Sequence, residues 1–478
     1  MAQISVLNGL ASDERGDLRA TYPVNLVPVP YENELSRGYL RPAEGIVEQT
    51  ASTPPGVDHG CHVWNGVLYR VLGGYLCSVA SDGTITQIAP VTTGLEVAQF
   101  AHSPTQMAVV TAVGSAYLLT GGTLAQITDI DLGDVIDVIF VDGYFMFTDG
   151  VFLIITELTD ASSIDALKYG SAEQDPDEIP AVLKARNEPV AVGRYTLEFF
   201  SNVGGGGFPF QRIDGALVTK GAIGTFACCV HHAPEGDLIA MVGSGKDEPV
   251  SVYLAAGAQC ARVSTPEIDT LLQGYTEADL AALCSVESRI ERGHEWLYVH
   301  LPDRTIVYDG IASKTSGEPV WFVLTSEQAA DTYSRYQARS LAWCYGQWNV
   351  ADPTSARIGT LTRESGEHYA VKVWWGFDTR LLHNNGKGAM LNELELIALT
   401  GRVAVSADPI ISTTHSTDGL TWSAERQIYS GRRGQRNKRL VWRQLGVWRT
   451  IRIQRFRGDS QSFLSFLRLE VTAEPLAF

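Results

Sequence analysis

Residues 62–88 read His62-Val-Trp-Asn-Gly-Val-Leu-Tyr-Arg-Val-Leu-Gly-Gly-Tyr-Leu-Cys-Ser-Val-Ala-Ser-Asp-Gly-Thr-Ile-Thr-Gln-Ile88. The stretch holds four short apolar runs, which are divided at Asn65-Gly66, Gly73-Gly74 and Asp82-Gly83. Asn-Gly and Asp-Gly supply the two positive-φ residues that a two-residue hairpin turn requires. The stretch therefore predicts four antiparallel strands joined by tight turns.

The same pattern recurs along the next part of the chain. Met107–Ile130 has breaks at Gly114-Ser115 and Gly121-Gly122, and Val135–Ile155 has breaks at Asp142-Gly143 and Asp149-Gly150. The spacing of roughly 40 residues is the period of β-propeller blades. One blade cannot bury both of its faces, so the units must pack radially. We therefore expect an all-β chain with a propeller of about six or seven blades over residues 57–385.

The pattern is weaker after Thr156. Apolar runs predict further strands at Val190–Phe200, Ile223–Val230, Leu238–Leu254, His294–Tyr308, Trp321–Leu324 and Leu341–Tyr345. One helix is predicted with Thr276 as N-cap, Asp279 at the third helical position, and Leu280 and Leu283 on the apolar face. The polar stretch 160–185, which contains Asp175-Pro176-Asp177, is expected to be a loop with room for one short helix.

A second β unit is expected over residues 386–478. Its turns are Thr400-Gly401, Asp408-Pro409 and Asp418-Gly419. About seven short strands in roughly 85 residues is the density of a β-sandwich. These strands are predicted at Leu391–Ala398, Val403–Val405, Ile410–His415, Trp422–Ile428, Leu440–Trp442, Thr450–Phe456 and Phe463–Val471.

The segment Thr21-Tyr-Pro-Val-Asn-Leu-Val-Pro-Val-Pro30 is rich in proline. Proline fixes φ and lacks a backbone N–H, so the segment can form neither a helix nor a central strand. We expect extended chain without ladder hydrogen bonds, within an N-terminal arm (1–56). Because extended chain needs a host surface, the arm is expected to pack on the 386–478 platform.

Composition describes a folded β protein. The chain has 478 residues, 45% of them hydrophobic and 19% charged, and its 46 glycines suit many tight turns. No apolar run approaches the roughly 20 residues needed to span a bilayer, and no signal peptide precedes the first strand, so membrane insertion is not expected. Seven cysteines, an odd number, argue against a disulfide framework and favour synthesis in a reducing cytoplasm.

Charge is distributed unevenly. The net charge is −17, yet residues 426–457 hold ten Arg and one Lys without a single Asp or Glu. Three interpretations of this block remain open: a solvated face, a docking surface for an acidic protein, or direct contact with phosphates. Docking is the interpretation we assign, to the following residues: Arg432, Arg433, Arg436, Lys438, Arg439, Arg449 and Arg452.

Motifs for catalysis or metal binding are weak. Cys228-Cys-Val-His-His232 offers zinc-type ligands, but strand geometry splits them between two faces. Gly243-Ser-Gly-Lys-Asp247 lacks the first glycine and the Ser/Thr of a phosphate loop, so a hairpin turn is expected. Ser416–Trp422 resembles the Asp-box of sialidase-type propellers with one residue missing, which is a structural hairpin cap. The run Gly204–Gly207 is expected to be a flexible or tightly bent loop. No catalytic residue, cofactor or metal is therefore assigned.

Several collinear segments resemble the tail hub (nozzle) proteins of short-tailed phages, the podoviral packaged-DNA stabilisation proteins. The N-terminal likeness lies in Pro23-Val-Asn25 and Gly38-Tyr-Leu-Arg41. It continues in Thr196-Leu-Glu-Phe-Phe-Ser201, Lys220-Gly-Ala-Ile-Gly-Thr-Phe-Ala-Cys228, Gly274-Tyr-Thr-Glu-Ala-Asp-Leu280, Val299-His-Leu-Pro302, Val307-Tyr-Asp309, Thr417-Asp-Gly419 and Lys438-Arg-Leu-Val-Trp442.

The resemblance implies a non-enzymatic virion protein, assembled in the host cytoplasm and located in the tail. It implies a homo-oligomeric ring, six-fold in this family, that docks below the portal and its head-to-tail adaptor protein. Such a ring continues the DNA channel, stabilises packaged double-stranded DNA without sequence-specific binding, and carries a tail needle or tip and a tailspike or fibre. The alternative function is a propeller that binds or processes glycans, which requires two carboxylates at fixed separation in a cleft.

Overall fold

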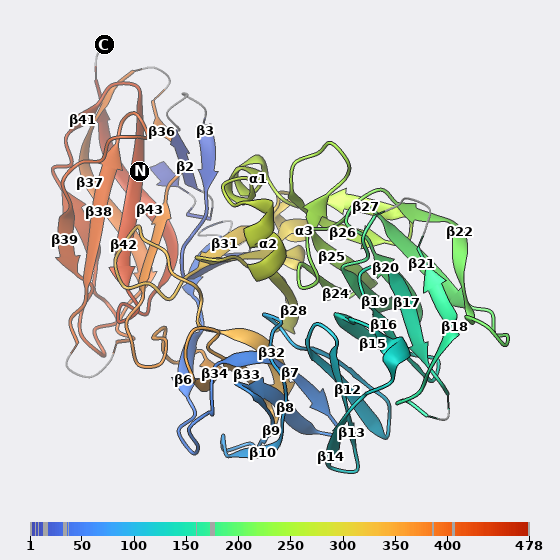
Figure 1. Ribbon diagram of the computed structural model, residues 1–478. Coiled ribbons are helices and arrows are strands. Elements are labelled where there is room, and N and C mark those ends of the chain that lie inside the picture. Colours follow the sequence, from blue (N-terminus) through green and yellow to red (C-terminus); the bar gives the residue numbers. More distant parts are fainter. Residues whose placement is uncertain are drawn as a thin grey trace. The chain divides into compact units, whose positions relative to one another are not determined.

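The computed structural model describes residues 2–4, 6–7, 9–12, 18–31, 36, 38–158, 160–172, 177–384, 387–403 and 407–476. Contacts divide the chain into two compact units (Figure 1). Unit 1 comprises residues 1–47, 303–336 and 361–478, and unit 2 comprises residues 48–302 and 337–360. None of the helices in the described ranges is long and apolar enough to cross a membrane. All seven cysteines fall in those ranges and are free thiols.

Unit 2 is built from successive antiparallel sheets. Each of the first four sheets has four strands in chain order, and the fifth adds one short strand. The first two sheets contain β7 (Asp58–Trp64), β8 (Val67–Leu72), β9 (Tyr75–Val79), β10 (Ile85–Pro90), β11 (Gln99–His102), β12 (Gln106–Ala112), β13 (Ser115–Thr120) and β14 (Thr123–Gln126). The 3-10 helix η1 (Ile130–Leu132) leads to the third sheet.

The remaining sheets of unit 2 follow the same order. The third and fourth sheets contain β15 (Asp137–Val141), β16 (Tyr144–Thr148), β17 (Phe152–Thr156), β18 (Ile164–Ser171), β19 (Ala181–Ala185), β20 (Glu188–Val192), β21 (Leu197–Asn202) and β22 (Phe210–Val218). The fifth contains β23 (Gly221–Ala222), β24 (Cys228–Ala233), β25 (Gly236–Ser244), β26 (Ser251–Ala256) and β27 (Gln259–Arg262). The last two sets in the unit are β28 (Ser285–Glu291) with β29 (His294–His300), and β32 (Arg339–Cys344), β33 (Gln347–Ala351) and β34 (Ile358–Thr362).

One strand from each of these seven sets lies in a closed ring of inner strands. Contacts run from β7 to β11, β15, β19, β24, β28 and β32, and then back to β7. The hydrophobic cores lie between neighbouring sheets, as where Phe147 of one sheet and Leu118 of the next share a cluster. Radial sheets around a ring of inner strands are the architecture of a β-propeller. The prediction of an all-β propeller is confirmed, with seven sets of strands.

Tight turns explain why the repeats are readable in the sequence. Asn65 and Gly66 have φ of 51° and 76°, and Asp142 and Gly143 have φ of 49° and 94°. These are the conformations that the hairpin argument requires, because two consecutive positive φ angles match the twist of the flanking strands. The turn residues therefore fixed the strand boundaries locally.

Unit 2 also contains two short helices. They are α1 (Pro266–Leu272) and α2 (Glu277–Leu283). Thr276 caps α2 by accepting a hydrogen bond from the Asp279 N–H at 3.1 Å, and Leu280 is buried, both as predicted. Sequence reasoning missed α1, although Thr265 caps it and Pro266 occupies its first position.

Unit 1 is a β-sandwich (Figure 1). One sheet has the order β4-β5-β43-β37-β40, with β1 on β43 and β41 on β37; the other has the order β35-β42-β38-β39, with β36 on β42. Trp375, Phe456 and Phe466 fill the core between them. The strands of the first sheet are β1 (Ala2–Ile4), β4 (Leu26–Pro30), β5 (Gly38–Pro42), β37 (Ala389–Leu399), β40 (Leu440–Arg443), β41 (Val447–Trp448) and β43 (Ser465–Pro475).

The strands of the second sheet are β35 (Trp374–Asp378), β36 (Leu382–His383), β38 (Ile410–Ser416), β39 (Arg426–Tyr429) and β42 (Ile451–Asp459). Unit 1 also holds the antiparallel pair β2 (Gly9–Ser12) and β3 (Leu18–Thr21), and the antiparallel pair β30 (Thr305–Asp309) and β31 (Trp321–Leu324), which α3 (Gly310–Ser316) connects. β6 (Gly45–Glu48) lies at the boundary of the two units. The β-sandwich prediction is confirmed, whereas the division into 1–56, 57–385 and 386–478 stays a prediction.

The proline-rich segment is a strand, contrary to the expectation of chain without ladder bonds. β4 pairs with β5 in antiparallel register, with Pro28 opposite Leu40 and Pro30 opposite Gly38. It occupies the edge of its sheet, so the prolines' missing N–H groups leave no gap in an interior ladder. The prediction that this segment is not a central strand is therefore confirmed, and the prediction that it makes no ladder hydrogen bonds is wrong.

Other sequence-based boundaries need correction. The stretch 160–185 contains β18 and β19 rather than a loop, because Ile164 and Tyr169 pack into the blade core; residues 173–176 lie outside the described part. The strand expected at Ile223–Val230 begins only at Cys228. The strand expected from Trp422 begins at Arg426. The Trp422 ring instead stacks on the Arg455 guanidinium, with Cζ of Arg455 3.7 Å from the ring centroid. In the strand expected at 403–405, Val403 is outside any strand and the other two residues lie outside the described part.

Candidate functional site

The cationic block of residues 426–457 lies in the β-sandwich and is separated into distinct places. Arg432, Arg433, Arg436 and Lys438 are exposed on the loop between β39 and β40, which we call the cationic loop (residues 431–439). Gly434 donates its N–H to the Gly401 carbonyl at 3.0 Å, and the Thr400 hydroxyl donates to the Gln435 carbonyl at 2.9 Å. These bonds hold the loop against the end of β37.

The same bonds bring a further cation to the loop. Arg402 follows Gly401 directly and is exposed. Sequence reasoning missed it because it lies outside the 426–457 block, and only the Gly401–Gly434 contact reveals its position. Within the described residues, Arg402, Arg433, Arg436 and Lys438 have no acidic partner.

Arg449 is remote from this loop. It lies beside Gly388, where β41 pairs with the first residues of β37, whereas β40 and the loop meet β37 near Leu396. β37 has 11 residues, and at about 3.3 Å per residue its ends are roughly 30 Å apart. Arg449 therefore belongs to another surface, although it is also exposed.

Several cations of the block are neutralised within the unit. Arg439 bonds Glu395 with Nε to Oε1 at 2.7 Å, and these hydrogen bonds raise the pKa of Arg439 and lower that of Glu395. Arg443 pairs with Glu393 at 3.0 Å, and Arg432 with Asp408 at 3.5 Å. Arg455 and Arg457 pair with carboxylates as well.

Arg452 does not belong to a docking surface. Its side chain is fully buried, with Nη1 donating to the Leu445 carbonyl at 2.8 Å and Nε to Gln454 Oε1 at 3.1 Å. Burial lowers the pKa of Arg452 to about 10. The prediction is wrong here because alternation along β42 turns residue 452 inward, which net charge along the sequence cannot reveal.

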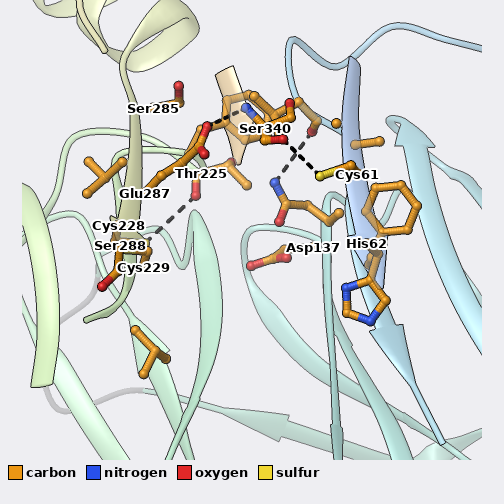
Figure 2. A pocket seen from close by; sticks show the side chains of 18 of the residues that line it. Cys61, His62, Asp137, Thr225, Cys228, Cys229, Ser285, Glu287, Ser288 and Ser340 are labelled. Carbon is orange, nitrogen blue, oxygen red and sulfur yellow. Dashed lines mark hydrogen bonds between the residues drawn. The ribbon is translucent and has the colours of Figure 1, made fainter. Parts of the chain in front are cut away.

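Unit 2 holds a second candidate site at the centre of its ring of inner strands, in a cavity that opens to solvent. A cavity of about 340 Å³ is lined by residues of the first strands of several sheets (Figure 2). Its polar lining includes Cys61, Asp137, Cys229, Glu287, Ser288 and Ser340. Among its described lining residues there is no Lys or Arg.

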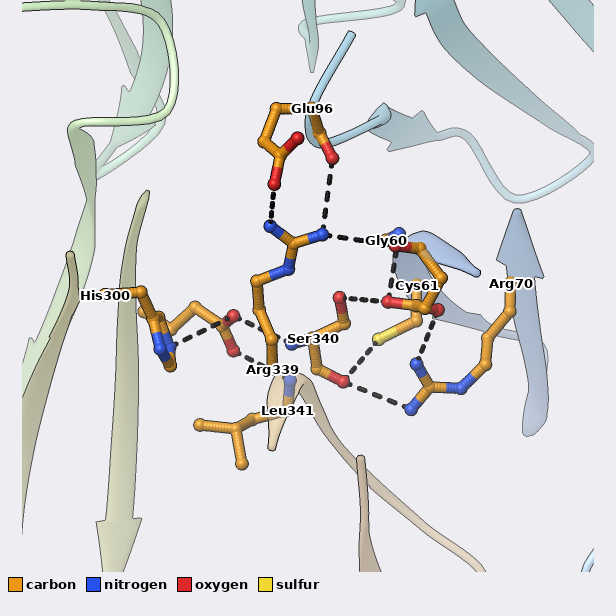
Figure 3. Close-up of polar contacts among 10 residues, drawn as sticks. Gly60, Cys61, Arg70, Glu96, His300, Arg339, Ser340 and Leu341 are labelled. Atoms are coloured by element: carbon orange, nitrogen blue, oxygen red, sulfur yellow. Dashed lines mark hydrogen bonds and ion pairs between the residues drawn. The ribbon is translucent and has the colours of Figure 1, made fainter. Parts of the chain in front are cut away.

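A buried ionic network lies beside the cavity and meets its lining at Ser340 (Figure 3). The Arg70 guanidinium donates to Asp58 Oδ1 at 2.9 Å and to the Ser340 carbonyl at 3.1 Å, and both charged side chains are fully buried. The Ser340 hydroxyl donates to Asp58 Oδ2 at 2.6 Å. Arg339 pairs with Glu96 at 2.7 Å and donates to the Asp58 carbonyl at 3.1 Å. The network joins β7 of the first sheet to β32 of the last and so fastens the ring where it closes.

Two cavity carboxyls connect neighbouring sheets through backbone N–H groups. Asp137 on β15 accepts the Val138 and Val182 N–H groups, each at 2.8 Å. Glu287 on β28 accepts the N–H groups of Ser340 at 2.8 Å and Leu341 at 2.7 Å. Burial raises the pKa of Asp137 to about 7 and raises that of Glu287 as well.

The raised pKa of Asp137 predicts a pH dependence of folding stability. An unfolded Asp loses its proton near pH 3.8, whereas folded Asp137 keeps its proton to about pH 7. Over this window the folded state binds more protons, so this residue's contribution to stability falls as pH rises. Asp137→Asn should lose less stability than the parent between about pH 5 and about pH 8 in denaturant titrations. Equal pH slopes for parent and variant would refute this account.

The weaker motifs have structural roles. Cys228 and Cys229 lie on β24, and His231 is buried with Nε2 2.8 Å from Glu295 and Nδ1 2.9 Å from Ser288. No group of three metal-ligating side chains occurs in the described part of the chain. The Gly243–Asp247 segment connects the antiparallel pair β25 and β26, which confirms a hairpin.

The two remaining motifs are turns. Asp418 accepts the Leu420 and Thr421 N–H groups, each at 2.8 Å, which confirms the hairpin cap. The Gly204–Gly207 run forms an exposed loop in which Gly204 and Gly205 have φ of 70° and 120°. These conformations strain any residue with a Cβ, which accounts for glycine there.

Comparison with known proteins places both units in one family. The family model described as Bacteriophage P22 Gp10, beta-propeller matches residues 2–366, and Bacteriophage P22 Gp10, beta-sandwich matches residues 374–474. The tail hub protein gp10 of Salmonella phage P22 is 28% identical over 468 residues, which is 93% of each chain.

Three solved structures resemble the chain loosely. The WD40 domain of Neurospora crassa Pan2 covers 66% of this chain and 94% of its own at a TM-score of 0.39 and 13% identity. The designed protein Ika8 covers 71% and 98% at a TM-score of 0.38 and 12% identity. PorZ of the Porphyromonas gingivalis type-IX secretion system covers 64% and 38% at a TM-score of 0.36 and 12% identity. At these scores the likenesses carry no argument about this chain.

Proposed function

The chain belongs to the Bacteriophage P22 Gp10 family, and from that membership we propose that it forms a closed ring in the tail of a short-tailed phage. It is a structural tail hub component of the virion. The ring has six copies and continues the channel through which packaged double-stranded DNA passes. Because neighbouring copies meet through different surfaces, the ring closes only when the rotation per copy divides a full turn.

The cationic loop is the surface that we assign to docking on the head-to-tail adaptor protein. The observation that carries this assignment is a set of four exposed cations that have no acidic partner in the described part of the chain. Arg433, Arg436 and Lys438 lie on a loop fixed by backbone hydrogen bonds, and Arg402 lies beside it. Unpaired charge on an otherwise acidic molecule accelerates association with an oppositely charged partner and sets its register. Arg432 and Arg439 are already paired with carboxylates, Arg452 is buried and Arg449 is distant, so these four are not included.

The DNA channel is assigned to other surfaces. If the cationic loop of every copy faced the genome, the ring would carry a band of cations around the exiting duplex. Each neutralised phosphate contributes about −0.9 to the slope of log binding constant against log salt concentration, so affinity is high at low salt. Such a band would therefore retain DNA rather than release it. The hub therefore stabilises packaged DNA by closing the channel together with a tail needle or tip, and it also carries a tailspike or fibre. It acts without catalysis, as a tail hub relative implies.

Charge reversal of the loop tests this function. Arg433→Glu with Arg436→Glu and Lys438→Glu should slow association with the adaptor by about tenfold to a hundredfold at low salt, because attraction becomes repulsion. Association rates of the purified proteins provide the measurement. The matched control is Arg186→Glu with Lys372→Glu and Lys387→Glu, which changes the net charge equally at exposed cations that are not part of the loop.

The control variant should associate like the parent. Equal slowing of both triple variants would mean that net charge alone matters and would refute the docking assignment. The parent and the control variant could instead bind duplex DNA with sub-micromolar, steeply salt-dependent affinity that only the loop variant loses. This result would assign the loop to DNA.

A further inference from the structure

The cavity at the centre of the unit 2 ring carries two carboxyl groups on opposite sides. Asp137 lies on β15 and Glu287 on β28, and two inner strands, β19 and β24, separate them in the ring (Figure 2). A cavity of about 340 Å³ is within the range of small-ligand sites. The space therefore has the size and the polar groups of a binding site.

Both carboxyl groups retain hydrogen-bonding capacity. Each oxygen of Asp137 and of Glu287 accepts one backbone N–H in the bonds described above. An ionised carboxylate offers about four acceptor positions, so roughly half of them remain available on each group. A ligand in the cavity can bond to both carboxylates without displacing the N–H groups that join neighbouring sheets.

Charge around the cavity is not balanced. Asp137 has no ion pair within the described residues, and the nearby Arg70 and Arg339 already pair with Asp58 and Glu96. Within the described residues Glu287 has one ion pair, with the His300 imidazole 3.5 Å away when that ring is protonated, and it is also attracted by the more distant Arg339 guanidinium. Buried Asp137 and half-buried Glu287, with so little counter-charge, attract a cation, and perturbed carboxyls in a cleft mark candidate binding sites.

The shape of the lining restricts the kind of cation. The described side chains include no group of three metal ligands, whereas Phe100, Leu183 and Phe226 supply apolar surface between the polar groups. A cation with an aliphatic body and charged ends matches apolar walls between two carboxylates. We propose that the cavity binds a linear alkyldiammonium ion, with one ammonium at Asp137 and the other at Glu287.

Calorimetric titration of the full chain with 1,4-diaminobutane at about pH 8 tests this proposal. Saturable binding of one diamine per chain is expected, and 1,4-butanediol, which has the same length without charge, should not bind. Asp137→Asn and Glu287→Gln should each weaken binding by about tenfold or more, because each removes one charge partner. Asp134→Asn, an exposed carboxylate that does not line the cavity, should bind like the parent.

A second variant avoids dependence on the two carboxyls. Gln99 lines the cavity and is half-buried, so Gln99→Lys places a tethered ammonium there. This variant should fold, as judged by circular dichroism, and should lose diamine binding, whereas Gln99→Met should retain it. Three results would each overturn the proposal. The folded Gln99→Lys variant could bind the diamine as tightly as the parent, Asp134→Asn could lose as much diamine affinity as the two carboxyl variants, or the parent could fail to bind the diamine.

The source of the ammonium is decided by a parallel titration. A lysine-containing tetrapeptide that competes with 1,4-diaminobutane would identify a partner's lysine side chain as an occupant of the same site. Absence of competition would identify free diamines as the ligand. Both results support an ammonium site and differ only in the source of the ammonium.

Discussion

Asp58→Ala is expected to lower the free energy of unfolding by about 3–5 kcal/mol, because it leaves the buried Arg70 guanidinium without its carboxylate. Asp58 also accepts the Ser340 hydroxyl at 2.6 Å and the Gly60 N–H at 3.2 Å, so the substitution breaks three bonds in one step. The Ser340 bond joins the last sheet of the ring to the first, and Arg70 adds a bond to the Ser340 carbonyl. Urea denaturation followed by intrinsic tryptophan fluorescence measures the change.

The control for this prediction is an exposed ion pair. Glu277→Ala removes the partner of Arg194, which lies 3.4 Å away, and the Glu277 side chain is 74% exposed. Exposed pairs contribute about 0–1 kcal/mol, so this variant should remain close to the parent. If Asp58→Ala proved no more destabilising than Glu277→Ala, the ionic network would not fasten the ring.

Asn25→Ala is expected to lower the free energy of unfolding by about 2–4 kcal/mol in the β-sandwich unit. The buried Asn25 amide donates to the Thr325 carbonyl at 3.0 Å and the Trp374 carbonyl at 2.7 Å, and it accepts the Thr325 N–H at 3.1 Å. Its φ of 51° also strains alanine. One side chain therefore ties the segment before β4 to residues about 300 and 350 positions later.

Asn25→Gly separates the two causes of this loss. Glycine adopts positive φ without strain but makes none of the amide hydrogen bonds. It should be less destabilising than alanine by about 1 kcal/mol and still well below the parent. A glycine variant as stable as the parent, in thermal or denaturant unfolding, would show that the amide contacts contribute nothing.

The candidate sites were only partly predictable from sequence. Clustering of Arg along the chain located the cationic loop, because a short loop keeps neighbouring residues together. It failed for Arg452 and Arg449, since strand alternation turns one inward and strand length carries the other away. It also missed Arg402, which a backbone contact across two loops adds to the cluster.

By itself, the sequence determined the repeated hairpins, the cap of α2 and the two β units. These features depend on φ preferences and hydrogen bonds within a few residues, which Asn-Gly, Asp-Gly and the Thr276–Asp279 pair specify locally. Only the tertiary structure decided that the proline-rich segment pairs as an edge strand, and that Asp137 and Glu287 share one cavity. Pairing, burial and charge compensation depend on residues distant in sequence, so no local pattern encodes them.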